Sequence, residues 1–307
     1  MKTNELCHVT TTSFHEQLGS ARYPFEAGRY WLFTSKLCPF AHRTELARKL
    51  TGLDESIGLT IAGSVQTEKG WDLAGIYAGN GNTPNPVPHI DRLPGIYALA
   101  APGYTGRASV PVLFDTQTQT IVNNESAEII AMFDAIAVGQ GDHATLYPQS
   151  RRARIDEIIE LLNDELISPI YRAGFAKNQA DYNVNSTRVF ATLARLDTQL
   201  ARTGPFIAGN ALTLADIHAY PHLARFDAIY HSLYRLNRHF IRDYPNLAAY
   251  LGRLGAIPEF AATLDLQASK DGYFLSWNQP SNAGFVPAGP LVDPRSGVAV
   301  AGARLAA

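Results

Sequence analysis

The stretch RYWLFTSKLCPFAHRTELARKL, Arg29–Leu50, decides the fold of the first half of the chain. Its first seven residues, RYWLFTS, are aromatic and rich in strand-forming side chains, which predicts a β-strand over Arg29–Ser35. Lys36 and Leu37 make a turn, and Cys38-Pro39 then opens a segment of helical composition. Proline suits the first helical position because the amide hydrogen it lacks would have no partner there. The stretch therefore predicts a strand, a cysteine at a helix start, and a helix.

The flanking sequence extends this pattern into an α/β domain. We expect further strands over 57–66, Ala108–Asp115 and Thr120–Asn124, and a helix over the segment SAEIIAMFDAIA that follows. A Gly- and Pro-rich loop over 67–108 separates the second strand from the third. The order β-α-β-loop-β-β-α is that of thioredoxin-like domains. In that fold a cis peptide bond faces the cysteine, and Val110-Pro111 lies where this bond is expected.

From Arg151 onward the pattern becomes helical, with apolar residues at three- and four-residue spacing. This predicts a fold of two domains, a thioredoxin-like α/β domain followed by an all-α domain. The expected boundaries are an N-terminal extension over 1–28, a thioredoxin-like thiol-binding domain over 29–137, a linker over 138–150, a helical domain over 151–275 and a C-terminal tail over 276–307.

Composition excludes several functional classes. The 307 residues are 46% hydrophobic and 18% charged, which is typical of a globular protein. The net charge of −2 does not favour binding to nucleic acid. No stretch approaches the roughly 20 apolar residues of a membrane span, and the N-terminal residues lack an apolar signal segment. Two cysteines, Cys7 and Cys38, suit a reducing compartment, so we expect a cytoplasmic protein. The nine histidines show no metal-ligand spacing, so no metal is assigned.

Cys38 is the main candidate for chemistry. A helix N-terminus stabilises a thiolate through its dipole and free N–H groups, and His42 and Arg43 add positive potential. A small buried core cysteine is the alternative reading. The residue three positions after Cys38 is Ala41, so the site cannot resolve a mixed disulfide internally and needs an external thiol. Cys7 is the other formal candidate nucleophile.

A second cluster suits a γ-glutamyl thiol. Glu125 and Ser126 stand at the start of the helix after the fourth strand, where N–H groups bind a carboxylate and Glu125 can accept from an ammonium. A helix cap with an acidic neighbour is the structural alternative. The Val110 backbone can pair with the cysteinyl part of a tripeptide thiol. Trp71, inside the long loop, either lines the thiol site or packs between domains.

The helical half offers candidates for an aromatic substrate. The phenol groups of Tyr171, Tyr230 and Tyr273 can donate hydrogen bonds to a phenolic substrate, although tyrosines in helical domains more often belong to the core. Thr213 and Asp216, three residues apart in LTLADIHAY, are typical of a helix-start capping box, which is structural.

Taken together, the ordered motifs resemble one family. The segments are RYWLFTSKLCPFAHR, GYTGRASVPVLFD, IVNNESAEII, IYRAGFA, RFDAIY, DYPNL and FVPAGP. They are similar to the glutathionyl-hydroquinone reductases, the omega-like xi class of glutathione transferases, from about Ala21 to Pro290. One departure is that the family usually has C-P-W-A-H-R, whereas Phe40 stands here in place of the tryptophan.

The resemblance implies a cysteine-dependent oxidoreductase with glutathione as co-substrate. The Cys38 thiolate attacks the glutathione sulfur of a glutathionyl-hydroquinone, and a second glutathione then releases Cys38. The resemblance also implies a homodimer formed through the helical domain. It places glutathione at Phe40, Trp71, Val110, Glu125, Ser126 and an arginine, either Arg92 or Arg107, and the aromatic substrate at Tyr171, Tyr230 and Tyr273.

Two other functions stay open at this point. An omega-like thioltransferase or dehydroascorbate reductase would use the same cysteine. A transferase-like module for protein association would leave Cys38 buried and inert. The natural thiol is either glutathione or another low-molecular-weight thiol.

Overall fold

The structure is a computed structural model that describes residues 14–74, 85–141, 143–280 and 284–300. Its contacts divide the chain into two compact units. The first, called the thioredoxin-like unit below, contains the described residues up to Leu146 together with Gln267–Gln279. The second, called the helical unit, contains Tyr147–Leu266 and the described residues from Pro280 onward.

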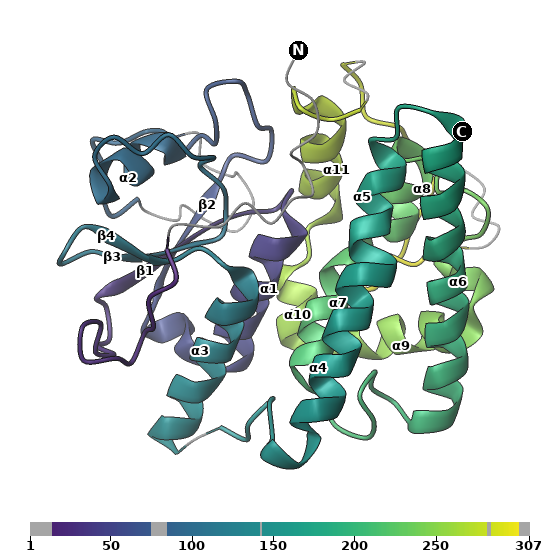
Figure 1. Cartoon of the computed structure of the whole chain (residues 1–307), viewed down its shortest axis with the longest axis horizontal. Coiled ribbons are helices and arrows are strands. Elements are labelled where there is room, and N and C mark those ends of the chain that lie inside the picture. The colour runs from purple at the N-terminus through teal and green to yellow at the C-terminus, as the bar shows by residue number, and fades with distance from the viewer. Residues whose placement is uncertain (1–13, 75–84, 142, 281–283, 301–307) are drawn as a thin grey trace. The chain divides into compact units, whose positions relative to one another are not determined.

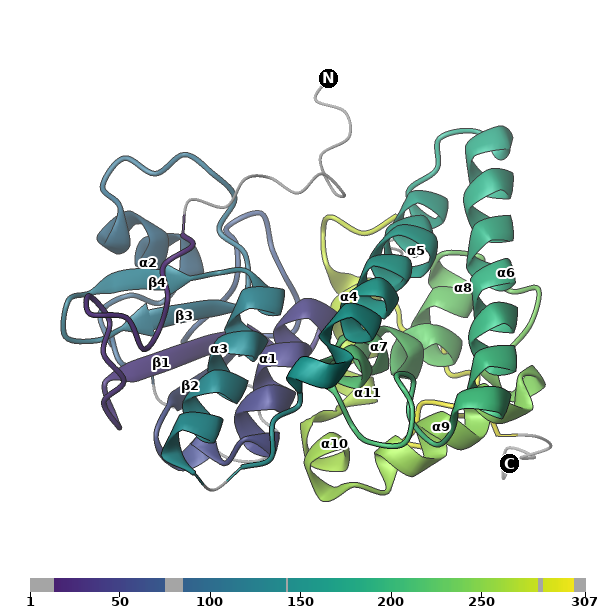
Figure 2. The same ribbon diagram turned by 60° about the horizontal axis from the view of Figure 1, so that its bottom comes forward.

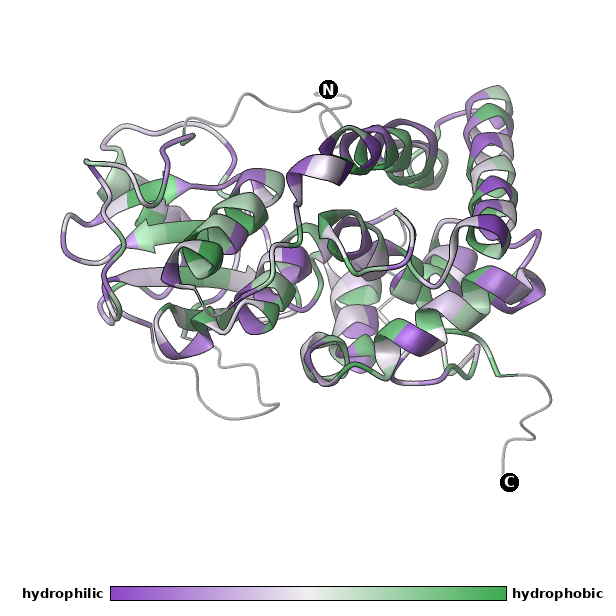
Figure 3. Cartoon of the chain, turned by 90° about the horizontal axis from the view of Figure 1, so that it is seen from below, coloured by the Kyte–Doolittle hydropathy of each residue, from purple (hydrophilic) through white to green (hydrophobic). Residues whose placement is uncertain are grey.

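The thioredoxin-like unit is built on one four-stranded sheet with the strand order β2-β1-β3-β4. Strand β1 pairs in parallel with β2 and antiparallel with β3, which pairs antiparallel with β4. All four predicted strands are present. Strands β1, Tyr30–Ser35, and β4, Thr120–Asn123, are one residue shorter than predicted, whereas β2, Gly58–Ala62, and β3, Val112–Asp115, have half the predicted length. Figure 3 shows hydrophobic colour on part of the sheet, and Leu32, Phe33 and Val112 have no exposed surface.

Helices cover both faces of this sheet. Helices α1, Pro39–Leu50, and α3, Ser126–Gln140, lie side by side on one face, as Figures 1 and 2 show. Helix α2, Leu93–Ala100, lies on the other face and contacts β4. A short 3₁₀ turn, Leu53–Glu55, follows α1. The sequence predicted loop where α2 lies, because Pro94 and Gly95 disfavour a helix; Pro94 is tolerated since it falls in the first turn.

The last helix, α11 (Leu266–Leu275), docks on the thioredoxin-like unit. The Ser269 hydroxyl donates to the Lys36 carbonyl at 2.7 Å, and the Gln66 amide donates to the Ser276 hydroxyl at 2.8 Å. At Gly272 an added Cβ would lie 2.6 Å from the Ser64 carbonyl oxygen, so only glycine allows this approach without a shift. The contact-based division therefore differs from the expected one, which assigned α11 to the helical domain.

The helical unit contains the remaining helices and no strand of the sheet. Two of its long segments continue through a π-helical turn without a break, Leu162–Ile167 after α4 and Phe226–Tyr230 after α7. Short 3₁₀ turns, Gln149–Arg151 and Ile241–Asp243, precede α4 and α9. The helices are α4 Arg152–Leu161, α5 Ser168–Gly174, α6 Gln179–Thr203, α7 Leu214–Arg225, α8 His231–Leu233, α9 Pro245–Gly255 and α10 Pro258–Thr263.

Helix α7 begins as the sequence predicted. Thr213 is its N-cap, and the Asp216 carboxylate accepts hydrogen bonds from the Thr213 N–H and hydroxyl. The predicted capping box is therefore confirmed. Asp216 also accepts from the Ile207 N–H and the Tyr250 hydroxyl, so it links α7 to α9 and to the turn before α7.

The C-terminal tail packs against the helical unit. The Tyr220 hydroxyl donates to the Arg295 carbonyl at 2.7 Å, and the Ala299 N–H donates to Asp227 at 2.8 Å. The fold class predicted from the sequence, a thioredoxin-like α/β domain with an all-α domain, is confirmed. None of the helices in the described ranges has the length and apolar character needed to cross a lipid bilayer.

Candidate thiol site

Cys38 caps the N-terminus of α1, as the sequence predicted. Its Sγ accepts a hydrogen bond from the Ala41 N–H at 3.5 Å and lies 3.5 Å from the Val110 carbonyl oxygen, to which the thiol donates. The predicted cis bond, Val110-Pro111, is present beside it. The side chain is half-buried, so it is neither sealed in the core nor fully exposed. Cys7, the alternative nucleophile, lies outside the described residues.

A buried cation joins the starts of two helices. Arg43, in the second turn of α1, has 2% of its surface exposed and donates to the Ser126 hydroxyl at 3.3 Å. Its guanidinium also lies 4.8 Å from the centre of the Phe40 ring. Lys36, in the turn before Cys38, forms a buried ion pair with Glu45 of α1. The positive charge of Arg43 therefore lies in the second turn of α1 and beside the first residue of α3, the helix start that was predicted to bind an anion.

The start of α3 is held in place by an asparagine. Glu125 is the N-cap and Ser126 the first helical residue, which confirms the predicted helix start. The Glu125 N–H donates to the Asn123 Oδ1 at 2.7 Å, and the Asn123 amide donates to Glu128 at 2.6 Å. Glu125 is partly exposed while Ser126 is buried. A local hydrogen bond from its own backbone thus holds Glu125, the N-cap of α3.

The predicted loop candidates differ in their surroundings. Trp71 is buried, and its carbonyl oxygen accepts from the Leu93 N–H at 3.0 Å. Arg92 forms an ion pair with Asp72 at 3.4 Å. Arg107 is exposed, and no carboxylate within the described ranges forms an ion pair with its guanidinium. Arg107 stands three residues before Val110.

The three candidate tyrosines fall in different units. Tyr171 and Tyr230 meet in the helical unit with ring centres 6.1 Å apart, and Tyr234 stacks on Tyr230 at 5.4 Å. Tyr171 is partly exposed whereas Tyr230 has no exposed surface. Tyr273 lies in α11, within the thioredoxin-like unit, and is 1% exposed. Tyr234, which follows Tyr230 by one helical turn, was not among the predicted tyrosines.

Comparison with known proteins identifies the family. Residues 37–136 match the N-terminal domain of glutathione S-transferases, and residues 179–253 match their C-terminal domain. Over 279 residues the chain is 36% identical to the glutathionyl-hydroquinone reductase YqjG of Escherichia coli, covering 90% of this chain and 83% of that protein. The chain belongs to the xi-class glutathione transferases, the glutathionyl-hydroquinone reductase family.

Solved structures of this family have the same fold. The xi glutathione S-transferase of Phanerochaete chrysosporium matches with a TM-score of 0.85 and 34% identity, covering 91% of this chain and 96% of that one. The glutathione-bound structure of YqjG from E. coli matches with a TM-score of 0.82 and 36% identity, covering 87% of both chains. The resemblance inferred from the motifs is therefore confirmed.

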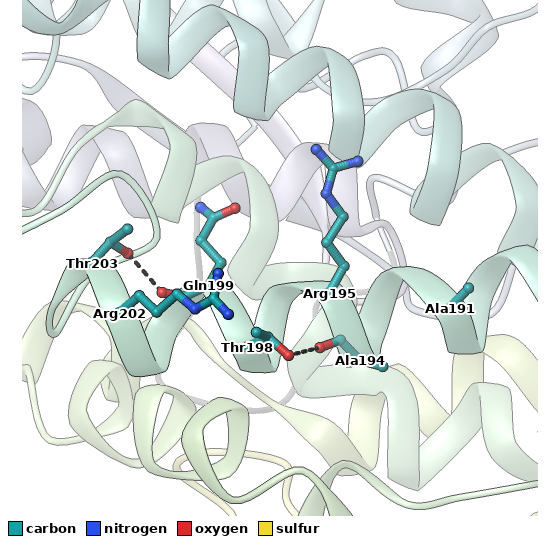
Figure 4. Close-up of a pocket in the computed structure, with 7 residues that line it drawn as sticks. All are labelled: Ala191, Ala194, Arg195, Thr198, Gln199, Arg202 and Thr203. Carbon is teal, nitrogen blue, oxygen red and sulfur yellow. Dashed lines mark hydrogen bonds between the residues drawn. The ribbon is translucent and has the colours of Figure 1, made fainter.

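A separate hollow lies along α6 of this xi-class protein. It has a volume of about 550 Å³, and Figure 4 shows the residues that line it, Ala191, Ala194, Arg195, Thr198, Gln199, Arg202 and Thr203. The two threonine hydroxyls donate back to carbonyls of their own helix, both at 3.0 Å. None of the seven is a predicted site residue. Within the described ranges, no group of three or more His, Cys, Asp or Glu residues is placed to hold a metal ion.

Proposed function

We propose that this protein reduces glutathionyl-hydroquinones to hydroquinones, with Cys38 as the nucleophile and glutathione as co-substrate. The observation that carries the proposal is the half-buried Cys38 sulfur at the N-cap of α1, in contact with the Ala41 N–H and beside Val110. The names of two relatives, both glutathionyl-hydroquinone reductases, and the glutathione-bound YqjG structure support it.

The proposed reaction has two steps, and in each a thiolate attacks the sulfur of a bound glutathione. The Cys38 thiolate attacks the glutathione sulfur of the conjugate, so an S–S bond forms and the aryl C–S bond breaks. The aromatic carbon keeps the electron pair and takes a proton, which yields the hydroquinone. A second glutathione thiolate then attacks the glutathione sulfur of the mixed disulfide, and Cys38 leaves as a thiolate. Ala41 in place of a second cysteine fits this dependence on an outside thiol.

Glutathione would lie along the thioredoxin-like unit. The Val110 backbone would pair with its cysteinyl part, while Glu125 and the start of α3 would hold the γ-glutamyl ammonium and carboxylate. We assign the arginine contact to Arg107, because Arg92 is already paired with Asp72. Phe40 and Trp71 complete the proposed glutathione contacts, with Phe40 held against Arg43.

The aromatic part of the conjugate would be held by tyrosine hydroxyls. We propose Tyr171, Tyr230 and Tyr273 for this role, and Tyr171 has the more accessible position of the pair in the helical unit. A phenol that donates a hydrogen bond to a hydroxyl oxygen of the hydroquinone ring would orient that ring for the attack. The homodimer through the helical domain and the cytoplasmic location stay predictions.

The experiment compares turnover of a glutathionyl-hydroquinone with that of a mixed disulfide such as hydroxyethyl disulfide. We expect Cys38→Ser to lose the first activity by roughly a thousandfold or more, as expected for loss of a nucleophile, while Cys7→Ser keeps it. Alkylation of Cys38 should proceed at pH values well below the ordinary thiol pKa of about 8.5. Activity retained in Cys38→Ser would contradict the mechanism. A clear preference for the mixed disulfide would favour the omega-like thioltransferase.

Mass spectrometry identifies the thiol. After exposure to a panel of low-molecular-weight disulfides, the wild-type protein should carry a glutathionyl adduct on Cys38. An adduct of another thiol in preference to glutathione would change the co-substrate but keep the role of Cys38. No adduct on Cys38 with any of them would support the non-catalytic reading.

A further inference from the structure

A single buried phenol holds the residue that precedes Val110. Tyr97, on α2, has 1% of its surface exposed. Its hydroxyl donates to the Ser109 carbonyl at 2.8 Å, and the Ser109 N–H lies 3.3 Å from the same oxygen and donates to it. The carbonyl and the N–H of Ser109 therefore both form hydrogen bonds with the Tyr97 hydroxyl. Because Ser109 is joined directly to Val110, this contact restrains the backbone that we assign to the cysteinyl part of glutathione.

The same oxygen also holds the residue that precedes Glu125. The Asn124 amide donates to the Tyr97 hydroxyl at 3.0 Å, and Asn124 is 5% exposed. Tyr97 thereby links two segments that come from different parts of the chain, one ending at Val110 and the other leading to Glu125 and Ser126. These are the two backbone regions that would hold opposite ends of the γ-glutamyl-cysteinyl unit.

Packing keeps the phenol in this position. The Tyr97 ring lies 5.0 Å from the ring of Tyr104 and meets the Phe14 ring edge-on at 5.8 Å. The Asn124 N–H in turn donates to the Phe14 carbonyl at 3.4 Å. Since the ring is held by aromatic neighbours and its oxygen has three polar contacts, Tyr97 restrains the spacing between the two segments.

We propose that Tyr97 is a positioning residue for glutathione, through its hydroxyl group, which sets the distance between the Val110 segment and the start of α3. The inference rests on the proposed function, because it takes these two segments as the glutathione site. The two hydrogen bonds of the reacting sulfur that we describe, with the Ala41 N–H and the Val110 carbonyl, do not involve Tyr97. Its loss should therefore weaken glutathione binding more than it slows the chemistry at Cys38.

The test variant is Tyr97→Phe, which keeps the ring and removes the oxygen. We expect its Kd for glutathione, measured by calorimetry, and its KM for glutathione to rise about tenfold, which corresponds to the loss of one or two preorganised contacts. We expect kcat to change less than about twofold and the pH profile of Cys38 alkylation to stay in place. A tenfold fall in kcat with an unchanged Kd would overturn the proposal.

Tyr30→Phe is the matched control. Tyr30 has no exposed surface, lies in the same unit, and its hydroxyl donates to the Pro24 carbonyl at 2.8 Å, away from both segments. This variant removes the same atom from an equally buried ring, so it should lower thermal stability but leave the Kd for glutathione unchanged. An equal rise in Kd in this control would show general loosening and overturn the positioning role.

A double variant tests the link through Asn124. If Tyr97 and Asn124 act through one contact, Tyr97→Phe combined with Asn124→Ala raises the Kd no more than the stronger single variant does. Fully additive effects would contradict a shared network. The proposed function fails separately: a wild-type protein that binds glutathione without turning over the conjugate refutes that function, while the Kd values still decide the role of Tyr97. A wild-type protein that binds no glutathione refutes both.

Discussion

The two units bury aspartates in opposite ways. Asp115, at the end of β3, has no exposed surface and meets a charged partner: the Arg29 guanidinium donates to its two oxygens at 3.0 and 2.6 Å. In the helical unit, Asp216 and Asp227 also have no exposed surface, but their hydrogen bonds come from neutral donors. Asp227 accepts from the Ile241 and Ala299 N–H groups and so ties the C-terminal tail to the unit.

These partners move the pKa values in opposite directions. Burial by itself would raise the pKa of Asp115, but the hydrogen bonds from Arg29, Thr118 and Gln117 outweigh it and lower that pKa below its ordinary value. For Asp216 and Asp227 burial is the largest effect, and the hydrogen bonds offset it only in part, so each pKa rises to about 6. A charged partner favours the ionised form far more than neutral N–H groups do.

The difference predicts opposite responses to pH. A carboxyl with a lowered pKa contributes stability that is present above its ordinary pKa and is lost as the pH falls through the folded value. A carboxyl with a raised pKa contributes stability that is present below its ordinary pKa, 3.8, and is lost as the pH rises through about 6. Through these groups, acid weakens the thioredoxin-like unit, and a rise from pH 4 to pH 7 weakens the helical unit.

The largest expected effect follows from removing the charge at Asp115. Asp115→Asn leaves the Arg29 guanidinium buried without its carboxylate, and we expect the free energy of unfolding to fall by about 3–5 kcal/mol. Amide hydrogen exchange should show the loss across the thioredoxin-like unit. The loss should shrink towards low pH, where the wild-type carboxyl is itself protonated.

Glu26→Gln is the control for that variant. Glu26 pairs with the same Arg29 at 2.9 Å, but its side chain is half-exposed, so we expect a change of about 1 kcal/mol or less. If the two variants lost similar amounts of unfolding free energy, burial of the Arg29–Asp115 pair would not be the source of its stabilising effect. The proposed difference between the two units would then be wrong.

The second-largest expected effect is the change in stability of the helical unit with pH that Asp227 causes. Because its pKa is about 6 against an ordinary 3.8, the wild-type helical unit should lose up to roughly 3 kcal/mol at this site between pH 4 and pH 7. Asp227→Asn cannot titrate, so its slope should be flatter, in addition to a fixed loss of about 1–3 kcal/mol from the poorer acceptor. Amide hydrogen exchange, corrected for the intrinsic exchange rate at each pH, measures the slope with pH and the fixed loss of stability.

The exposed Asp156 provides the matched substitution for this measurement. Asp156→Asn makes the same chemical change at an exposed side chain, and it should flatten the slope of the helical unit less than Asp227→Asn does. A steeper slope in Asp227→Asn, or an equal flattening in the two variants, would contradict the raised pKa at Asp227.

Local sequence patterns were enough for most of the architecture. The strand RYWLFTS, the cysteine at the helix start and the capping box of α7 each depend on neighbours within a few residues, and all were found. Helix α2 was missed because Pro94 and Gly95 in its first turn resemble a loop. The docking of α11 was missed for a different reason: Ser269 contacts Lys36, which lies 233 residues earlier, and no local pattern records such a contact.

In the candidate site, too, local sequence patterns do not predict contacts between residues that are far apart in the chain. Motifs predicted that Cys38 and Val110 would meet, and that Glu125 and Ser126 would start a helix, and the structure has both features. The roles of these residues stay predictions. The contact between Arg43 and Ser126 and the network around Tyr97 depend on side chains from separate elements, so only the folded structure shows them.

The smallest expected change in stability comes from replacing two helical glycines with alanine. These variants test whether α11 belongs to the thioredoxin-like unit, as the division into two units assumes. In α11 an added Cβ at Gly272 would lie 2.6 Å from the Ser64 carbonyl oxygen and 2.7 Å from the Leu37 Cβ, so Gly272→Ala should cost about 1–3 kcal/mol. Gly252 is exposed in α9, and no atom of the described residues outside its own stretch of helix lies within 4 Å of such a Cβ, so Gly252→Ala should instead gain up to about 1 kcal/mol from helix propensity. Hydrogen exchange should place the loss in the thioredoxin-like unit and the gain in the helical unit. If Gly272→Ala loosens the helical unit and spares the sheet, α11 belongs energetically with the helices, and the C-terminal boundary expected from the sequence is the better description.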